Sequence, residues 1–320
     1  MTEKVADGRA TEVGEALARH RPDLLRHCYR MLGAYGDAEE LVQEVLLRAW
    51  RSRETYAGDA PVRHWLMRIA TNACLNALTR GGPRGLPQLD RPAAALGLPF
   101  EELEAAHWIT PAPDARLFPD PEEATEARES VAIAFIALLQ RLAPKQRAVL
   151  LLKDVIGWSV EEIAAALELT VSSVSSALHR ARQTVTAGPR GQPAEPEAQI
   201  VRDYLRAWHE RDLDGLVALL RKDVIFAMPP HATWFRGAKT VAAFLQTPRF
   251  AGFWARGFWT LPTRANGLPA VIWYAPRTDG ALRPHSIQVM RFEGGLLAEA
   301  INFIGAPYLR GFDPPDELPT

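Results

Sequence analysis

Apolar residues recur at helical intervals in two adjacent segments near the middle of the chain. The first set is Val160, Ile163, Ala164 and Leu167, and the second is Val174, Leu178, Ala181 and Val185. This spacing predicts two short amphipathic helices. Ser159 and Glu162 have the form of a capping box, and Thr170 can cap the second helix, so the break falls near residues 168–170. The segment therefore predicts a helix-turn-helix.

The second of these helices leaves a polar face to solvent if Val174 and Leu178 pack inward. That face combines short hydroxyls with amide and basic groups, which can meet phosphates and base edges in a DNA major groove. Its members are Ser172, Ser173, Ser176, His179, Arg180 and Gln183, with Arg182 in the same basic cluster. An ordinary helical hairpin with a solvated basic face has the same pattern, so these two helices alone leave DNA binding open.

The remaining pattern divides the chain into domains. Helical periodicity covers residues 21–79, with breaks at 33–36 and 56–61, and returns from about residue 121 to 186. Prolines, glycines and acidic residues fill the stretch between, which predicts a linker with one short helix near residues 100–106. The expected boundaries are 15–82 for a first helical domain, 83–124 for the linker, 125–187 for a second helical domain, 188–197 for a hinge, 198–312 for a last domain and 313–320 for a tail.

The last domain changes its period. An amphipathic helix is expected over residues 200–220, and strand-like segments follow it, with Gly294-Gly295 as a hairpin turn. These segments are "DVIFAMPP", "AVIWYAP", "SIQVMRFEGG" and "LLAEAINFI". The fold class is therefore multidomain: two all-α domains, the second with the helix-turn-helix, and a C-terminal α+β domain.

Residues 37–50, "DAEELVQEVLLRAW", predict a helix whose outer face is acidic and also carries one apolar side chain. The inner face holds Ala38, Leu41, Val42, Val45 and Ala49, and the outer face holds Asp37, Glu40, Gln43, Glu44 and Leu47. An exposed leucine among acids is a candidate docking surface, although a solvated helix face has the same composition. The pattern alone leaves both interpretations open.

Residues 62–80, "VRHWLMRIATNACLNALTR", predict a helix with Trp65, Ile69, Ala73 and Leu78 at core-like spacing. Its other face mixes basic and amide groups, which suits an unpaired nucleic-acid strand. Those groups are Arg63, His64, Arg68, Asn72, Asn76 and Arg80. The preceding loop at 56–61, which begins with Tyr56, lies at the right place to form a pocket for a flipped base.

Composition limits the partners. The chain has 37 Lys and Arg against 38 Asp and Glu, with a net charge of −1, so a nucleic-acid contact needs a local patch. The charged N-terminus lacks the apolar core of a signal peptide, and no later stretch is long and apolar enough for a membrane span. We therefore expect a cytoplasmic protein. Cys28 and Cys74 lie in helical patterns, where buried free thiols are expected rather than a disulfide or a metal site.

Taken in order, the three helical segments strongly resemble the bacterial sigma-70 superfamily, and within it the extracytoplasmic-function (ECF) group with two sigma domains. Residues 37–50 look like the helix that this group docks on the clamp helices of the largest RNA polymerase subunit. Residues 62–78 look like its helix for opening and reading the upstream promoter element. Residues 142–182 look like its second domain, which reads the more distant element. The resemblance covers about residues 21–79 and 129–185.

The resemblance implies partners and residue roles. The partners would be the core polymerase, through the clamp helices and the flap of the second-largest subunit, and promoter DNA. Matching positions imply polymerase contacts through Gln43 and Glu44, strand contacts through Trp65, Arg68 and Asn72, and groove contacts through Ser172, Ser176 and Arg180. Asn76 stands where the family is expected to have an acid, which puts the strand preference in doubt. Glu168 stands where its turn often has glycine, which costs about 1 kcal/mol if the backbone there is left-handed.

The C-terminal residues resemble the SnoaL-like branch of the nuclear transport factor 2-like superfamily, a helix packed on a curved, cone-shaped sheet. The cone is the candidate site for a ligand or for a regulatory contact, and a small molecule is a possible partner. Its expected lining is rich in aromatics and poor in acids: Trp208, Phe226, Met228, Trp234, Phe258, Trp273, His285, Gln288 and Asn302. His285 could act as a base, but a lone histidine beside strands is more often structural, and no catalytic residue, cofactor or metal is assigned.

The segment "RFAGFWARGFW", residues 249–259, is a second candidate for regulation. Phe253, Trp254, Phe258 and Trp259 are too dense for a solvated loop, so they are expected to contact the sigma domains or, alternatively, to plug the cone. The sequence thus predicts a sigma factor whose activity is modulated by its fused C-terminal domain. Two alternatives are a one-component regulator with a ligand-sensing cone and a cone-fold isomerase or cyclase fused to a DNA-binding module.

Overall fold

The computed structural model describes residues 2–56, 58, 60–120, 129–186 and 198–316. They form two compact units, which we call the helical unit and the sheet unit. The helical unit comprises Met1–Arg84 and Ala115–Pro189, and the sheet unit comprises Gly85–Asp114 and Arg190–Thr320. Most of the predicted linker therefore folds with the sheet unit. The predicted hinge at 188–197 lies outside the described residues.

The helical unit packs the long first helix against two further helices and continues into the helix-turn-helix. Its elements are α1 (Thr2–Leu32), α2 (Tyr35–Arg51), η1 (Arg53–Thr55), α3 (Val62–Leu78), η3 (Glu129–Val131), α7 (Ile133–Gln140), α8 (Pro144–Leu150), η4 (Leu151–Val155), α9 (Val160–Leu167) and α10 (Val171–Thr186), with α5 (Asp114–Leu117) at its boundary. Four of the five residues predicted for the inner face of α2, Ala38, Val42, Val45 and Ala49, are fully buried, and Leu41 is half-buried.

The buried face of α3 is wider than the predicted one and agrees with it in part. Trp65 and Ala73 are buried as predicted, Ile69 and Leu78 are only half-buried, and Leu66, Ala70 and Cys74 are fully buried. A helix that packs against two neighbouring helices buries a wide band of side chains. The spacing of its apolar residues alone therefore does not identify all the residues that are buried. Cys28 and Cys74 are buried free thiols, as expected.

The predicted helix-turn-helix is present. Ser159 accepts a hydrogen bond from the Glu162 amide and its own amide donates to the Glu162 carboxylate, which completes the capping box. The Ser173 amide donates to Thr170 Oγ1 at 3.2 Å, so Thr170 caps the second helix. Glu168 ends α9 in the left-handed region, with φ 53° and ψ 48°. The turn therefore keeps the backbone that favours glycine, at a cost of about 1 kcal/mol.

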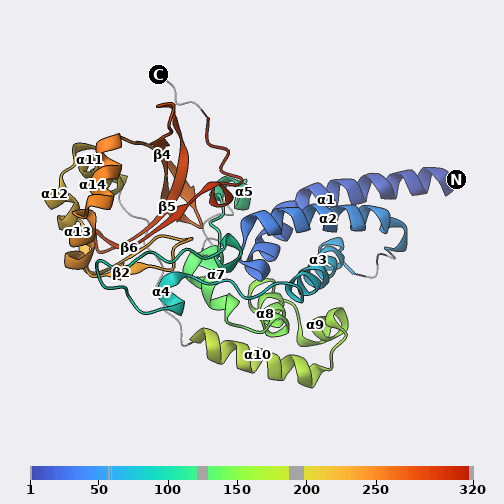
Figure 1. Ribbon diagram of the computed structural model, residues 1–320. Helices are drawn as coiled ribbons and strands as arrows, with labels where there is room; N and C mark the ends of the chain where they lie inside the picture. The colour runs from blue at the N-terminus through green and yellow to red at the C-terminus, as the bar shows by residue number, and fades with distance from the viewer. Residues whose placement is uncertain (1, 57, 59, 121–128, 187–197, 317–320) are drawn as a thin grey trace. The chain divides into compact units, whose positions relative to one another are not determined.

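The sheet unit is a six-stranded sheet with helices gathered on one side (Figure 1). The strand order is β2-β1-β6-β5-β4-β3, with β1 and β6 parallel and the other neighbours antiparallel. Its elements are α4 (Pro87–Asp90), η2 (Ala105–His107), α11 (Ala198–Glu210), α12 (Leu213–Ala218), β1 (Leu220–Ala227), β2 (Trp234–Arg236), α13 (Ala238–Leu245), α14 (Pro248–Arg256), β3 (Trp259–Ala265), β4 (Leu268–Pro276), β5 (Leu282–Glu293), β6 (Leu296–Ile304) and η5 (Ala306–Tyr308).

Several sequence expectations for this unit need correction. The single helix over 200–220 is two helices, because Arg211 adopts a positive φ of 57° between α11 and α12. The short helix expected near 100–106 is wrong: only the 3-10 turn at Ala105–His107 forms, and the residues before it pair with the sheet unit. The helix α14 and the strand β3 were not predicted. The Gly294-Gly295 turn is confirmed, since both glycines have positive φ between β5 and β6.

The linker is held to the sheet unit by backbone hydrogen bonds. The Ala94 amide donates to the Trp234 carbonyl at 2.9 Å, and the Leu103 amide donates to the Pro230 carbonyl at 3.0 Å. In return, the Ala232 amide donates to the Glu101 carbonyl at 2.8 Å. These bonds lie on both sides of the segment 95–100. The linker therefore behaves as an added part of this domain rather than as a free tether.

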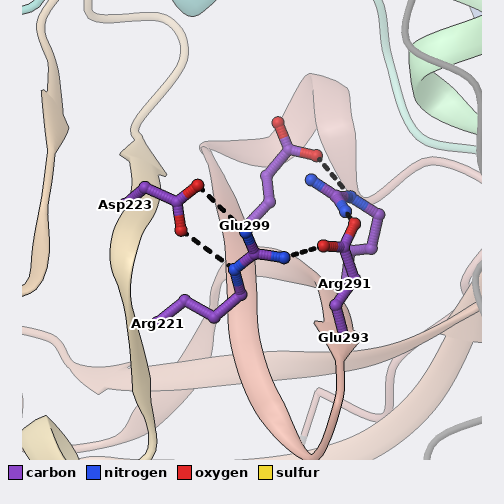
Figure 2. A network of polar contacts seen from close by, with 5 residues as sticks. All are labelled: Arg221, Asp223, Arg291, Glu293 and Glu299. Atoms are coloured by element: carbon purple, nitrogen blue, oxygen red, sulfur yellow. Dashed lines mark hydrogen bonds and ion pairs between the residues drawn. The ribbon is translucent and has the colours of Figure 1, made fainter.

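Side chains strengthen this attachment at both ends. Gln88 Nε2 donates to Glu299 Oε1 at 3.0 Å, and Glu299 belongs to an ion-pair network on the sheet (Figure 2). In that network Arg291 pairs with Glu299 and Glu293, and Arg221 joins Glu293 to Asp223. At the other end, Asp114 accepts from the Gly267 amide at 2.8 Å and pairs with Arg264.

Candidate nucleic-acid interface

The predicted docking face of α2 is exposed. Asp37, Glu40, Gln43 and Glu44 are all exposed, and Leu47 exposes 56% of its surface. Asp37 Oδ2 lies 2.5 Å from Arg84 Nη2, and Glu44 pairs with Arg48 one turn later, at 3.2 Å. The whole predicted face is therefore accessible to a partner, although a single exposed leucine is also common on protein surfaces.

The predicted groove-reading face of α10 is also exposed. Val174 and Leu178 are buried, while the polar face points to solvent. Its exposed members are Ser172, Ser173, Ser176, His179, Arg180, Arg182 and Gln183. Arg182 differs from the rest, because its guanidinium makes a two-point contact with Asp154, with Nε–Oδ2 at 3.0 Å and Nη2–Oδ1 at 2.5 Å. The pair is exposed to solvent, so Arg182 remains a predicted DNA contact that is held by Asp154 in the free protein.

The predicted strand-reading surface of α3 has a different environment. Arg68, Asn72 and Asn76 are exposed, whereas Trp65 is only 9% exposed and its ring lies 5.1 Å from that of Tyr56. Arg63 Nε lies 3.1 Å from Asp23 Oδ2, an ion pair that ties α3 to α1. The tyrosine and tryptophan thus form an aromatic pair at the start of α3, and Arg63 is engaged inside the first helical domain.

The helix-turn-helix domain covers this surface. The His64 ring lies 4.8 Å from the Trp158 ring, and His64 Nδ1 is 3.6 Å from Glu162 Oε1. A hollow of about 380 Å³ separates the two domains here. One wall holds Tyr56, His64, Trp65 and Arg68, and the other holds Trp158, Glu162, Ala165 and Ala166. The residues expected to read an unpaired strand therefore face the first helix of the helix-turn-helix. The residue pattern gave no signal for Trp158, which precedes the capping box.

Buried arginines join the two helical domains. Arg147 on α8 is 2% exposed and donates to the Met31 carbonyl, to Gln140 Oε1 at 2.7 Å and to the Gln140 and Leu142 carbonyls at 3.2 Å. Burial lowers the pKa of Arg147 to about 10. Arg30 on α1 donates to the Ser130 carbonyl at 2.9 Å, and its burial lowers its pKa to about 9. Both side chains remain cations at neutral pH and hold the domains through carbonyl oxygens.

The sheet unit contains a cavity of about 270 Å³ at the mouth of the cone. Of the expected lining, seven residues are there: Trp208, Phe226, Met228, Trp273, His285, Gln288 and Asn302. Phe253 also lines it. Two expected members do not: Trp234 is used to hold the linker, since its Nε1 donates to the Arg91 carbonyl at 2.9 Å, and Phe258 stacks on Phe253, 5.4 Å away. Sequence reasoning missed Phe100, which comes from the linker.

The aromatic segment 249–259 is not an open docking surface. Phe253, Trp254 and Phe258 pack against the core of the sheet unit, because they lie on the amphipathic α14 and the turn after it. Trp254 lies 5.5 Å from Trp208, ring to ring. Only Trp259 of the four is exposed, at 50%. The expectation that these four side chains form an exposed contact surface is wrong for three of them.

Comparison with known proteins agrees with this arrangement. Residues 16–84 match the Sigma-70 region 2 family, 132–185 match Sigma-70 region 4, and 201–300 match the SnoaL-like domain. The ECF RNA polymerase sigma factor SigG of Mycobacterium tuberculosis is 39% identical over 324 residues, which covers 98% of this chain and 86% of SigG. The chain belongs to the ECF RNA polymerase sigma factors.

A further relative, SigJ, is similar in both sequence and structure. SigJ of Mycobacterium tuberculosis, also an ECF sigma factor, is 30% identical over 241 residues, which covers 72% of this chain and 70% of SigJ. The crystal structure of SigJ aligns with a TM-score of 0.60 and 25% identity, covering 93% of this chain and 98% of that one. The helical unit thus holds the two sigma domains, and the sheet unit is a SnoaL-like domain. Membership in this family decides in favour of the sigma factor over the two alternative functions.

Within the described ranges, no cluster of three or more His, Cys, Asp or Glu side chains could hold a metal ion. None of the helices in this part of the chain is long and apolar enough to cross a bilayer.

The contact between the two sigma domains generates a stability prediction. Replacing Arg147 with methionine leaves the Met31, Gln140 and Leu142 carbonyls without their donor. We expect Arg147→Met to lower the free energy of unfolding of the helical unit by about 2 kcal/mol, because unsatisfied buried acceptors cost roughly 1–3 kcal/mol. Urea denaturation followed by circular dichroism measures it.

Lys145→Met is the matched control, since Lys145 is exposed on the same helix. It should change stability by no more than about 0.5 kcal/mol. Equal effects of the two substitutions would show that Arg147 does not join the domains.

Proposed function

We propose that this sigma factor docks on the core polymerase through the exposed face of α2 and reads promoter DNA with α3 and α10. The observation that carries the proposal is that an acidic face with an exposed leucine and a hydroxyl-rich basic face stand on separate helices of one unit. Docking would use Asp37, Glu40, Gln43, Glu44 and Leu47 on the clamp helices of the largest subunit. The second sigma domain would meet the flap of the second-largest subunit and the distal promoter element.

Promoter reading divides into two kinds of contact. An unpaired strand would stack near the Tyr56–Trp65 pair and meet the amide and guanidinium groups of Asn72 and Arg68. The distal element would remain duplex, with α10 in its major groove and Arg180 as the basic group free to reach a base edge or a phosphate. Arg63 would act by holding its own domain together.

The described arrangement of the helical unit corresponds to a closed state. A strand cannot reach His64 and Trp65 while Trp158 and Glu162 lie against them, so the two sigma domains separate before promoter opening. The SnoaL-like domain modulates this step because it holds the linker between them. Binding to polymerase supplies the free energy for opening, since a partner that prefers one state shifts the population toward it.

We further propose that the SnoaL-like domain does not catalyse a reaction. In the part of the chain that the structure describes, no aspartate or glutamate lines its cavity. Burial lowers the pKa of His285, and the charge of Arg256 lowers it further, so this imidazole is neutral at neutral pH. Among the described lining residues His285 therefore has no acidic partner to complete a proton transfer.

The docking assignment predicts the effect of a double substitution. Gln43→Ala with Glu44→Ala should weaken binding to core polymerase several-fold, because both side chains are exposed on the docking face and neither supports the fold. Pull-down of core polymerase measures binding, and circular dichroism checks the helices. The control is Gln199→Ala with Glu210→Ala, an exposed pair on α11. Unchanged capture of core by the Gln43/Glu44 variant would exclude this face.

The groove assignment predicts a difference between two neighbouring arginines. Arg180→Ala should weaken binding to a distal-element duplex by about 1–3 kcal/mol and relax selectivity at one position if the contact is bidentate to guanine. A phosphate contact would instead weaken all duplexes alike and flatten the salt dependence. Arg182→Ala should have a smaller effect, because its guanidinium is paired with Asp154. Fluorescence anisotropy with duplexes selected from a random library compares them, and equal losses would reject the assignment.

A further inference from the structure

The linker between the two sigma domains supplies part of the wall of the cavity in the SnoaL-like domain. Phe100 lines this cavity of about 270 Å³ although it lies some hundred residues before the domain in sequence. Its ring centroid is 5.5 Å from that of His231, 6.0 Å from Phe244 and 6.5 Å from Phe235. The cavity is therefore complete only when the linker is docked.

The chain holds Phe100 in place from both sides. The Ala94–Trp234 bond precedes it, and the Glu101–Ala232 and Leu103–Pro230 bonds follow it. Between them, Leu96 and Leu98 are 43% and 57% exposed, so the loop places one apolar side chain inward and leaves the others in water. Phe100 is thus the residue through which this loop contacts the cavity.

The lining indicates the chemistry of a ligand. Aromatic rings dominate, among them Trp208, Phe244 and Trp273. The indole Nε1 of Trp273 and the amide Oδ1 of Asn302 are buried and have no hydrogen-bond partner among the described residues. One is a donor and the other an acceptor, and a hydroxyl group can serve both kinds of partner. Among the described lining residues there is no carboxylate to neutralise a cation, and the one guanidinium, that of Arg256, belongs to an exposed residue.

The volume sets the size. A cavity of about 150 Å³ lined by apolar side chains holds one benzene ring, so this cavity suits a molecule of roughly one or two rings. Buried polar groups without partners are costly, and a ligand that satisfies them recovers that cost. The fit is therefore to a small aromatic alcohol rather than to a hydrocarbon or a charged metabolite.

We propose that the cavity binds an uncharged phenol-type ligand of one or two rings and that the ligand holds the linker docked, with Phe100 as the coupling residue. The ligand contacts the Phe100 ring as part of its wall, so it binds the docked state more tightly than the undocked one. By linkage, it stabilises docking by the same factor. The bound ligand thus opposes release of the linker.

Docking of the linker on the SnoaL-like domain shortens the distance that the linker can span between the two sigma domains. The effect on promoter reading rests on the proposed function. The Gly85 amide donates to the His107 carbonyl at 2.9 Å, and the Ile109 amide donates to the Gly85 carbonyl at 3.1 Å. The segment thus returns to its starting point, whereas the same residues undocked could span roughly 70 Å or more at about 3.3 Å per residue. A ligand that keeps the loop closed restrains the opening that promoter reading needs.

The test uses the full chain with 2-naphthol as probe and isothermal titration calorimetry as readout. We expect a Kd of about 100 µM for a ligand of this size. Phe100→Ala should weaken binding about fivefold or more. Phe100→Leu, which keeps a large apolar side chain and so disturbs the fold less, should weaken binding less. Leu98→Ala, an exposed control in the same loop, should leave it unchanged. Trp273→Phe, which removes the indole donor, should weaken 2-naphthol several-fold.

Hydrogen exchange gives the second readout. In the unchanged chain, 2-naphthol should slow exchange of the Ala94 and Leu103 amides, and Phe100→Ala should remove that slowing. Absence of 2-naphthol binding up to 2 mM, roughly twentyfold above the expected Kd, would overturn the ligand class. Binding that Phe100→Ala and Leu98→Ala affect equally would overturn the coupling. Neither measurement contains polymerase or DNA, so either failure leaves the proposed sigma function standing.

Discussion

Backbone hydrogen bonds from the linker to the sheet unit limit how far the two sigma domains can move apart. Each such bond contributes only about 1 kcal/mol net, so a few of them make docking firm but reversible. Buried side chains add to this, since Trp108 and Ile109 are 3% and 0% exposed and the Trp108 indole donates to the Pro230 carbonyl at 3.0 Å. A partner that binds with nanomolar affinity supplies enough free energy to release a linker held by these contacts. Without such a partner the linker stays docked.

The docked linker also explains why a weak contact between the two sigma domains can persist inside the helical unit. Arg147 and Arg30 join the sigma domains through carbonyl oxygens, and the α9 helix then covers the surface that includes Trp65 and Arg68. A contact made by buried cations to carbonyl oxygens is a modest stabiliser, because the desolvation of each guanidinium offsets much of its hydrogen bonding. A docked linker keeps the two sigma domains close together, which raises the effective concentration of each domain near the other. A modest contact is therefore enough to keep them together.

Local signals in the sequence were enough for the elements that depend on short-range chemistry. The capping box at Ser159, the exposed face of α2 and the glycine hairpin each depend on residues of a single helix or turn, and all were predicted. The predictions that failed depend on distant partners. Phe100 reads as part of a proline-rich linker because its neighbours Phe235 and Phe244 are far away in sequence, and Trp254 reads as exposed until α14 packs on Trp208.

The central claim is that the free chain holds its two sigma domains closed and opens on the polymerase. The most direct measurement is the distance between spin labels at Arg48→Cys on α2 and Ser176→Cys on α10, both exposed, while the native thiols Cys28 and Cys74 are buried. Pulsed electron double resonance should give one narrow distance for the free full-length protein and a longer one when core polymerase is added. A broad distribution in the free protein, or the same narrow distance in both states, would contradict this account.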